Sequence, residues 1–489
     1  MKKKIIYFSV VVLCMQFAFA QGDNTTVHEF QGGNVNFDLT YYTGFLYGIG
    51  SRNLNTNSSL ENYGAESIYW NPAGLAFMEK SQLFVDYAPP LTVNPKAFVD
   101  FQEEVNTSID DEFQDKLSNN AVYNYPDLKT NFPSGARIQS IALAMPFDKL
   151  TLGLSYYNPF ELKLEALESG FRTFIVDNEQ SATEQQTAFR ASGDLNAFLH
   201  IFAESYSFAM AYQFTDQFAA GLTVEYYNVL AKAKADFNFY GSIALGYNGN
   251  FGETILFNDD SRGYKNSLFS TLEGKFSGGS WGMRLGSSYR IMDFGEVAFT
   301  ANIPFTVHLD GYLDIIQRSP PFYSGGEIDE DLIDPNQTTL TEETIYHSNG
   351  MKIKLPGNVN LGYTHAFGGF TVITNFGYHF NEFSYNYSNT ESFSDDTTVV
   401  SRSYNGGMKM KTDLRLGLDF GAVKIGGGAI FAEKVLDKKD VDDGKKPSTF
   451  ILPVFSFAFG IPITENLRFD ANLLSLSMPF SRITLSYLF

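Results

Sequence analysis

The chain has 489 residues and a formal net charge of −20, and it contains 47 phenylalanines, 28 tyrosines and 42 glycines. So acidic a surface argues against nucleic acid as a partner. The only cysteine is Cys14, which excludes an intramolecular disulfide, so stability must come from burial and backbone pairing.

Residues 1–20 have the pattern of a secretory signal peptide. Three lysines at positions 2–4 precede an apolar run at residues 5–17, and the small-x-small sequence at 18–20 fits a cleavage site. We expect cleavage after Ala20. Cys14 follows Val12 and Leu13 rather than small residues, so it belongs to the apolar core of the signal and not to a lipid-attachment site.

The next notable stretch is Tyr-Trp-Asn-Pro-Ala-Gly-Leu-Ala at residues 69–76, which separates an aperiodic segment from a long alternating one. Asn71 before Pro72 is pushed out of the α region, and Pro72 fixes its own φ. Ala73 and Gly74 complete the motif, and Gly74 permits a backbone angle that a side chain would penalise. The motif is either a turn into the first strand or part of a gating element.

After this motif the chain alternates apolar and polar residues in paired segments joined by short turns. Residues 141–145 and 150–156 form the first pair, and residues 206–214 and 218–226 form the second. Further paired segments run from 281–291 into 297–309, from 358–367 into 370–380, from 414–420 into 423–431, and from 450–461 into 467–474. The period of two predicts strands throughout.

The connections are short on one side of these pairs and long on the other, and no apolar run of 18 residues follows the signal. This asymmetry is typical of an outer-membrane barrel, whereas a soluble β-sandwich would share only the alternation. Aromatic residues at the strand ends fit membrane-interface girdles. The terminal strand ends on Tyr487 and Phe489, which we expect to be the signal that the barrel assembly machinery reads.

The long connections are polar and mostly acidic. Residues 98–117 carry apolar side chains at spacings of three and four, which predicts a helix that either caps the outer mouth or packs on neighbouring loops. Residues 319–347 and 437–446 read as charged loops. They could hold divalent cations shared with lipopolysaccharide, although solvated loops are the simpler interpretation.

The six histidines have no metal-ligand spacing, and the acidic run at 440–444 lacks the later ligands of a calcium loop. There is no G-x-S-x-G motif and no phosphate-binding glycine loop. We therefore expect no enzyme activity, no metal and no cofactor.

Several separated patches resemble the long-chain fatty acid transporter family of outer-membrane barrels, the FadL, OmpP1 and TodX group. The first is Asn71-Pro72-Ala73, which is similar to the N-P-A of the family's plug. The others, in the family's order, lie at residues 150–160, 207–224, 281–289 with 307–311, and 355–363. The chain departs from the family at Glu161, where the family usually has glycine, and near Tyr378, where the family often has tryptophan.

The resemblance implies an all-β fold, a transmembrane antiparallel β-barrel of 14 strands with a small N-terminal plug in the lumen. It implies a signal peptide at 1–20, a plug segment at 21–79 and a barrel with long extracellular loops at 80–489. The implied function is uptake of long-chain fatty acids or other hydrophobic compounds by passive diffusion across the outer membrane of a Gram-negative bacterium. Membrane lipid and hydrophobic small molecules would be the partners.

In this family the plug rearranges and the ligand leaves through a gap in the wall caused by a kinked strand. The resemblance assigns ligand binding or gating to Asn71, Pro72, Ala73 and Gly74. We place the wall kink at Asn158 and Pro159, although a strand simply ending at the interface would show the same residues. Two other functions stay open, namely a barrel of the same fold that docks to a secretion machinery, as PorV does, and a hydrophilic porin.

Overall fold

The computed structural model describes residues 25–43, 64–89, 91–93, 101–134, 137–178, 185–247, 250–257, 269–291, 294–319, 323–324, 327–328, 342–380, 383–393, 396–434, 436, 446–475 and 479–489. The predicted signal peptide at 1–20 lies outside these residues. So do the acidic stretches at 329–341 and 437–445.

The wall is a closed barrel of 14 antiparallel strands, as the alternation predicted. Pro304 and Pro356 each interrupt a wall strand, because proline cannot donate to the ladder. In chain order the wall consists of β3 (Gln82–Ala88), β7 (Arg137–Phe147), β8 (Leu150–Asn178), β9 (Gln185–Gln213), β10 (Phe218–Tyr247), β12 (Phe269–Ile291), β13 (Gly295–Ile303) with β14 (Phe305–Ser319), β17 (Glu342–Leu355) with β18 (Gly357–Phe367), β19 (Phe370–Phe380) with β20 (Phe383–Phe393), β21 (Asp396–Asp419), β22 (Val423–Lys434), β23 (Thr449–Pro462), β24 (Leu467–Ser475) and β25 (Pro479–Leu488).

The last strand closes the barrel on the first. β25 pairs with β3 so that Leu485 lies opposite Val85 and Tyr487 opposite Leu83. The backbone N–H of Phe489 donates to the carbonyl of Ser81 at 2.9 Å. Among the described wall strands, closure therefore leaves each strand paired on both sides in the lipid, where an unsatisfied backbone group would be costly.

Deleting Phe489 is expected to lower the amount of barrel inserted in the outer membrane several-fold. The deletion removes the exposed terminal aromatic ring, which stacks on Tyr487 with ring centroids 6.3 Å apart. It also removes the backbone hydrogen bond to Ser81 where β25 closes on β3. Quantifying folded barrel by heat-modifiable mobility in isolated outer membranes measures this. Phe294→Ala, which removes an exposed ring on another turn of the barrel, is the control. Wild-type amounts of the deletion variant would refute the assembly role of the terminal residue.

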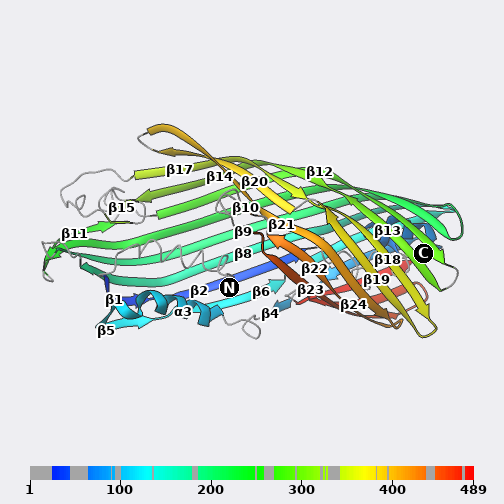
Figure 1. Cartoon of the computed structure of the whole chain (residues 1–489), viewed down its shortest axis with the longest axis horizontal. Coiled ribbons are helices and arrows are strands. Elements are labelled where there is room, and N and C mark those ends of the chain that lie inside the picture. Colours follow the sequence, from blue (N-terminus) through cyan, green and yellow to red (C-terminus); the bar gives the residue numbers. More distant parts are fainter. Residues whose placement is uncertain are drawn as a thin grey trace.

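The strands are much longer than a membrane requires. β8 and β9 have 29 residues each and β10 has 30, whereas about 9–11 residues cross a bilayer. Figure 1 shows these strands running from the turn end of the barrel, where the C-terminus lies, to the opposite end of the molecule. Short turns mark the periplasmic side of such barrels, so the projecting half is extracellular. The long connections expected after these strands are therefore largely continuing strand.

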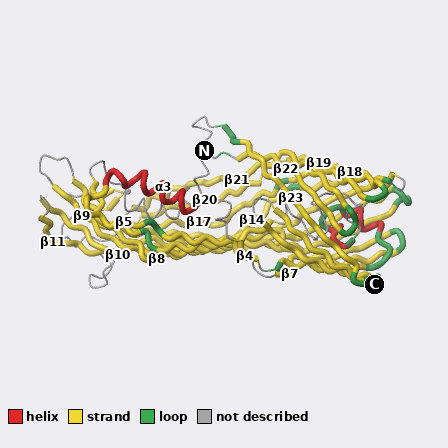
Figure 2. The backbone as a smooth tube through the Cα atoms, turned by 90° about the horizontal axis from the view of Figure 1, so that it is seen from below, coloured by secondary structure: helices red, strands yellow, loops and turns green. Residues whose placement is uncertain are grey.

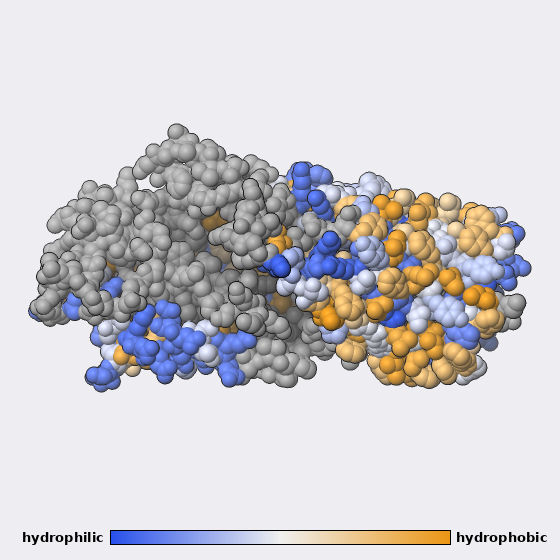
Figure 3. Space-filling model, in the orientation of Figure 1, coloured by the Kyte–Doolittle hydropathy of each residue, from blue (hydrophilic) through white to orange (hydrophobic). Residues whose placement is uncertain are grey.

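An apolar belt surrounds the turn end of the barrel. On β9 the side chains of Tyr206, Phe208, Met210 and Tyr212 all face outward and are 43% to 50% exposed. Figure 3 shows the belt as orange atoms over the half of the molecule that carries the turns. An exposed apolar surface of this extent on a closed barrel is a lipid contact surface, which places the chain in the outer membrane of a Gram-negative bacterium.

The projecting half gains additional strands on the free side of β8. β1 (Thr25–Gln31) and β2 (Asn34–Thr43) pair antiparallel with the outer part of β8. β5 (Leu117–Asn124) and β6 (Asp127–Ser134) then pair in parallel with β1 and β2. Smaller elements are β4 (Leu91–Val93) beside β6, β11 (Asn250–Phe257) beside β10, the 3-10 turn η4 (Gln114–Lys116), and the pair β15 (Tyr323–Ser324) and β16 (Glu327–Ile328).

The helix predicted at residues 98–117 is present as α3 (Phe101–Phe113). Its buried Phe113 packs on Phe30 of β1 with ring centroids 5.4 Å apart. Phe30 shares a sheet face with Phe171 of β8, so α3 covers the inner side of the sheet near its outer end. The hydroxyl of Tyr123 donates to Asp110 of α3 at 3.2 Å, and burial together with this hydrogen bond raises the pKa of Tyr123. Among the described residues, no helix is both long enough and apolar enough to span a bilayer.

Candidate functional site: a plugged apolar lumen

Two short 3-10 helices fill the barrel near its turn end. They are η1 (Ala65–Ile68) and η2 (Pro72–Phe77), and Figure 2 shows them as helical segments enclosed by strands close to the C-terminus. Ala65, Ile68, Ala73 and Leu75 are completely buried there. The described residues of the segment predicted as a plug, residues 21–79, thus show two kinds of structure. Its first part adds strands to the wall, and residues 64–78 lie in the lumen.

The Asn-Pro-Ala-Gly motif forms the start of η2. Asn71 is extended and caps the helix, because its side-chain oxygen accepts from the N–H of Ala73 at 3.1 Å. Pro72 occupies the first helical position, where its missing N–H costs nothing. Gly74 continues the helix and does not adopt a positive φ, so the conformational freedom of glycine is not used at this position. The amide of Asn71 also donates to the carbonyl of Ser287 in β12 at 3.3 Å, which ties the motif to the wall.

Glycines in the wall make room for the plug. A Cβ atom at Gly286 would lie 2.8 Å from Cδ of Pro72, and one at Gly221 would lie 2.5 Å from the carbonyl carbon of the same residue. A Cβ atom at Gly153 would come within 2.7 Å of Ile68. The plug backbone therefore touches the wall directly, at positions where any side chain would displace it.

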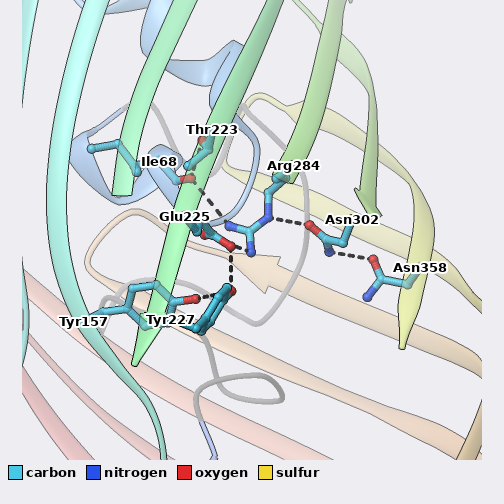
Figure 4. A network of polar contacts seen from close by, with 8 residues as sticks. All are labelled: Ile68, Tyr157, Thr223, Glu225, Tyr227, Arg284, Asn302 and Asn358. Carbon is cyan, nitrogen blue, oxygen red and sulfur yellow. Dashed lines mark hydrogen bonds and ion pairs between the residues drawn. The ribbon is translucent and has the colours of Figure 1, made fainter. Parts of the chain in front are cut away.

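A buried polar network holds the other side of the plug (Figure 4). Arg284 of β12 forms an ion pair with Glu225 of β10 at 3.4 Å and donates to the carbonyl of Ile68 at 3.5 Å. The hydroxyl of Thr223 donates to the same carbonyl at 2.9 Å. The side-chain oxygen of Asn302 accepts a hydrogen bond from Arg284, and its amide nitrogen donates to the side-chain oxygen of Asn358 at 2.6 Å. Removing one partner of so buried an ion pair would cost about 3–5 kcal/mol.

An aromatic cluster joins the plug to the wall. Tyr69 of the plug lies 4.9 Å from the ring of Tyr157 in β8 and 5.1 Å from Trp70. Tyr227 stacks on Phe305 at 4.7 Å, and its hydroxyl lies 2.9 Å from that of Tyr157. The guanidinium of Arg284 lies 4.4 Å from the ring of Tyr69, so the cluster and the polar network share a residue.

Beyond this cluster the inner face of the wall becomes apolar. Phe305 also belongs to a second cluster formed by β8, β9, β10, β12, β14 and β17. Its buried members are Ala203, Val229, Ala231, Phe276, Val307, Leu309 and Leu355. A third cluster, with Met410, Ile430, Ala432 and Val454, lies on the inner side of β21, β22 and β23. Ligand arriving from outside would therefore meet apolar walls before it reached the plug.

The apolar inner face continues into the extracellular half. β9 pairs with β10 without a register shift, so every second residue keeps the same direction over the whole strand. The inward positions of β9 beyond Ala203 are Ile201, Leu199, Ala197 and Leu195, and those of β10 beyond Ala231 are Ala233, Ala235 and Phe237. Most of these side chains are partly exposed, which leaves an apolar surface for a ligand to contact.

The opposite face of the same strands is mostly polar, with Phe198 and Phe202 of β9 as apolar exceptions. Between the inward residues, β10 carries Lys232, Lys234 and Asp236, and β9 carries His200, Asn196 and Asp194. A soluble sheet would bury its apolar face under a second layer. Here the inner face instead continues the lumen of the barrel, so we regard it as an apolar path, which we call the apolar lining.

The predicted kink at Asn158 and Pro159 coincides with an irregularity of β8. Tyr157 lies opposite Ser205 and Phe160 opposite Ala203, so two residues of β8 oppose the single Glu204 of β9. The neighbour on the other side of β8 changes at the same point. The pairing with β7 ends at Tyr157, and the pairing with β2 begins at Phe160. We call this place the seam. Arg137 of β7 bridges it by an ion pair with Glu161.

Sequence reasoning singled out Asn71 and Pro72 but missed Arg284, which donates to the Ile68 carbonyl of the plug, its ion-pair partner Glu225, and Tyr69 of the aromatic cluster. A usable signal was present, since Arg284 and Glu225 are charged residues at inward positions of membrane-spanning strands. Such residues are kept only when they are paired or serve a function.

Fold and site together define a plugged β-barrel of the outer membrane. No protein-family model matches the chain, and no curated protein matches it in sequence. The structure is similar to that of the Pseudomonas putida toluene transporter TodX, with 12% identity and a TM-score of 0.45 over 87% of this chain and 94% of that one. It is also similar to a Pseudomonas aeruginosa FadL homologue, with 13% identity and a TM-score of 0.44 over 90% and 97%.

A weaker likeness extends to the siderophore receptor PiuA from Acinetobacter baumannii, with 8% identity, a TM-score of 0.21 and coverage of 83% and 82%. TodX and the FadL homologue represent the channel family that the motifs of the sequence resemble.

Proposed function

We propose that this protein takes up hydrophobic compounds, such as long-chain fatty acids, across the outer membrane by passive diffusion. The observation that carries the proposal is the apolar lining, which leads from the extracellular half to an aromatic cluster on the plug. An apolar molecule leaves water at each contact along this path, and no energy source is needed when the gradient points inward.

The plug supplies the gate in this proposal. A ligand that reaches the aromatic cluster would compete with Tyr69 for contact with Tyr157 and Tyr227. Displacing Tyr69 removes the ring that covers Arg284 and weakens the hold on the Ile68 carbonyl. Ligand binding and plug movement are coupled through Arg284, which contacts both Tyr69 of the aromatic cluster and the carbonyl of Ile68. Asn71, Pro72, Ala73 and Gly74 move with the plug.

Exit would then occur sideways, at the seam. Tyr157 contacts the plug and immediately precedes Asn158 and Pro159, where β8 has lost its pairing with β7 and has not yet paired with β2. Sideways release keeps the apolar ligand away from water, because it passes directly from the lumen into the lipid. A hydrophilic porin would instead need an open polar lumen, which the tightly fitted plug does not provide.

Leu199→Asp is the substitution that tests the role of the apolar lining. We expect uptake of a labelled long-chain fatty acid by cells lacking other hydrophobic transporters to fall about tenfold. A desolvated carboxylate costs more than the 1.4 kcal/mol that corresponds to this factor. Asn196→Asp adds the same charge at an exposed outward position of the same strand and should leave uptake unchanged. Equal uptake by both variants would show that the ligand does not follow this face.

A further inference from the structure

Three lysines and one histidine form a row across the outer face of the extracellular wall. Lys163 of β8 lies opposite His200 of β9, His200 opposite Lys232 of β10, and Lys232 opposite Lys275 of β12. Directly opposed residues point to the same side of a sheet. The neighbouring Ala231 faces the lumen, so the row faces outward. We call Lys163, His200, Lys232 and Lys275 the basic row.

The basic row lies just outside the membrane. The same four strands carry a parallel row of Tyr156, Tyr206, Tyr226 and Trp281, which forms the outer aromatic girdle of the apolar belt. Lys232 follows Tyr226 by six residues, about 20 Å along the strand at about 3.3 Å per residue. Strands in such barrels tilt by about 40°, so the height above the girdle is about 15 Å. This is the level of the headgroups of the outer leaflet.

The charges of the row are only partly compensated within the protein. Lys163 pairs with Glu165 at 2.8 Å, and the Nε2 atom of His200 lies 3.2 Å from Glu161. Within the described part of the chain, neither Lys232 nor Lys275 forms an ion pair, and both are exposed. Like charges directly opposite each other destabilise a sheet. Two such lysines side by side in a chain of net charge −20 point to an anionic partner outside the protein.

The neighbouring rows do not share this character. One step further from the membrane the same strands carry Glu165, Phe198, Lys234 and Glu273, which mix both signs. One step nearer they carry Glu161, Phe202, Leu230 and Ser277, which include no lysine or arginine. The excess positive charge is therefore confined to one level above the bilayer.

We propose that the basic row binds the phosphate groups of the glycolipid in the outer leaflet, lipopolysaccharide. The ammonium groups of Lys232 and Lys275 contact phosphate as exposed point charges. The apolar belt and the aromatic girdle below hold the acyl chains and the interface of the same lipid. This contact is independent of the transport function, since it uses only the outer face of the wall.

The test compares the full barrel in detergent or nanodiscs with the double variant Lys232→Gln, Lys275→Gln. The control variant Lys116→Gln, Lys129→Gln changes the net charge equally, on one partly buried lysine of η4 and one exposed lysine of β6. Bound lipopolysaccharide per barrel is measured by native mass spectrometry after exposure to a fixed lipid concentration at low salt. We expect at least a fivefold loss for the double variant and none for the control, with heat-modifiable mobility confirming that both are folded.

Two further arms identify the ligand group. Lipopolysaccharide stripped of its phosphates should bind the wild type no better than the double variant, and raising the salt concentration should reduce the wild-type advantage. Inorganic phosphate at a concentration equal to that of the lipid phosphate should not displace the lipid. Equal lipid binding by wild type and double variant, or full displacement by inorganic phosphate, would overturn the proposal.

Discussion

Gly286→Leu is expected to expel the plug from the barrel while the wall still folds. A leucine at this position in β12 would enter the space occupied by Pro72 and the capping side chain of Asn71. Overpacking of this kind costs about 1–3 kcal/mol, which shifts a plugged-to-open equilibrium by about 5- to 150-fold. We expect a matching rise in single-barrel ion conductance in planar bilayers and greater sensitivity of cells to hydrophilic antibiotics.

Gly427→Leu provides the matched control for this effect. Gly427 lies in β22 of the same wall, and a Cβ atom there would have no neighbour closer than 3.5 Å. Its conductance should stay at the wild-type level. If Gly286→Leu also conducted like the wild type, the plug could not be held by its close fit against β10 and β12.

Deletion of Pro159 is expected to reduce uptake of hydrophobic compounds at least about tenfold while leaving the barrel folded. The deletion leaves Asn158 alone opposite Glu204, which restores a regular ladder between β8 and β9 without reversing the direction of any side chain. A regular strand removes the local bend and twist that separate β8 from β7 at the seam. The ligand would then have no lateral exit and would have to leave through the plug. We therefore expect release into the lipid to fail while ligand capture is retained.

Pro159→Ala separates the kink from the proline itself. It keeps the extra residue in β8, so the two-against-one register and most of the uptake should remain. Ligand binding to the purified deletion variant should also remain, which distinguishes lost exit from lost capture. Normal uptake by the deletion variant would show that the seam is not the route of exit.

The membrane half of this fold could be predicted because its information is local. Each hairpin combines a period of two with a short turn, and the strand predicted at 370–380 coincides with β19. The turn at Gly368 adopts a φ of 44°, as a tight connection requires. The order of the motifs along the chain further predicted that these hairpins form one barrel and that a plug precedes them.

The extracellular half could not be predicted in the same way. The pairing of β2 with β8 joins residues more than a hundred positions apart, and no local pattern specifies it. The apolar lining was overlooked because Lys232, Lys234 and Asp236 make the segment look like a polar loop, although the residues between them alternate regularly. The partners of the plug, Arg284 and Glu225, depend on contacts between strands and plug that only the folded barrel creates.

The most direct test of the account is the initial rate at which a labelled long-chain fatty acid and a neutral aromatic hydrocarbon enter cells with and without this protein. Both rates should rise severalfold when the barrel is present, in proportion to the external concentration and without dependence on cellular energy. Entry of a small hydrophilic solute should be unchanged. Equal entry of both hydrophobic compounds in the two strains would contradict the proposed function.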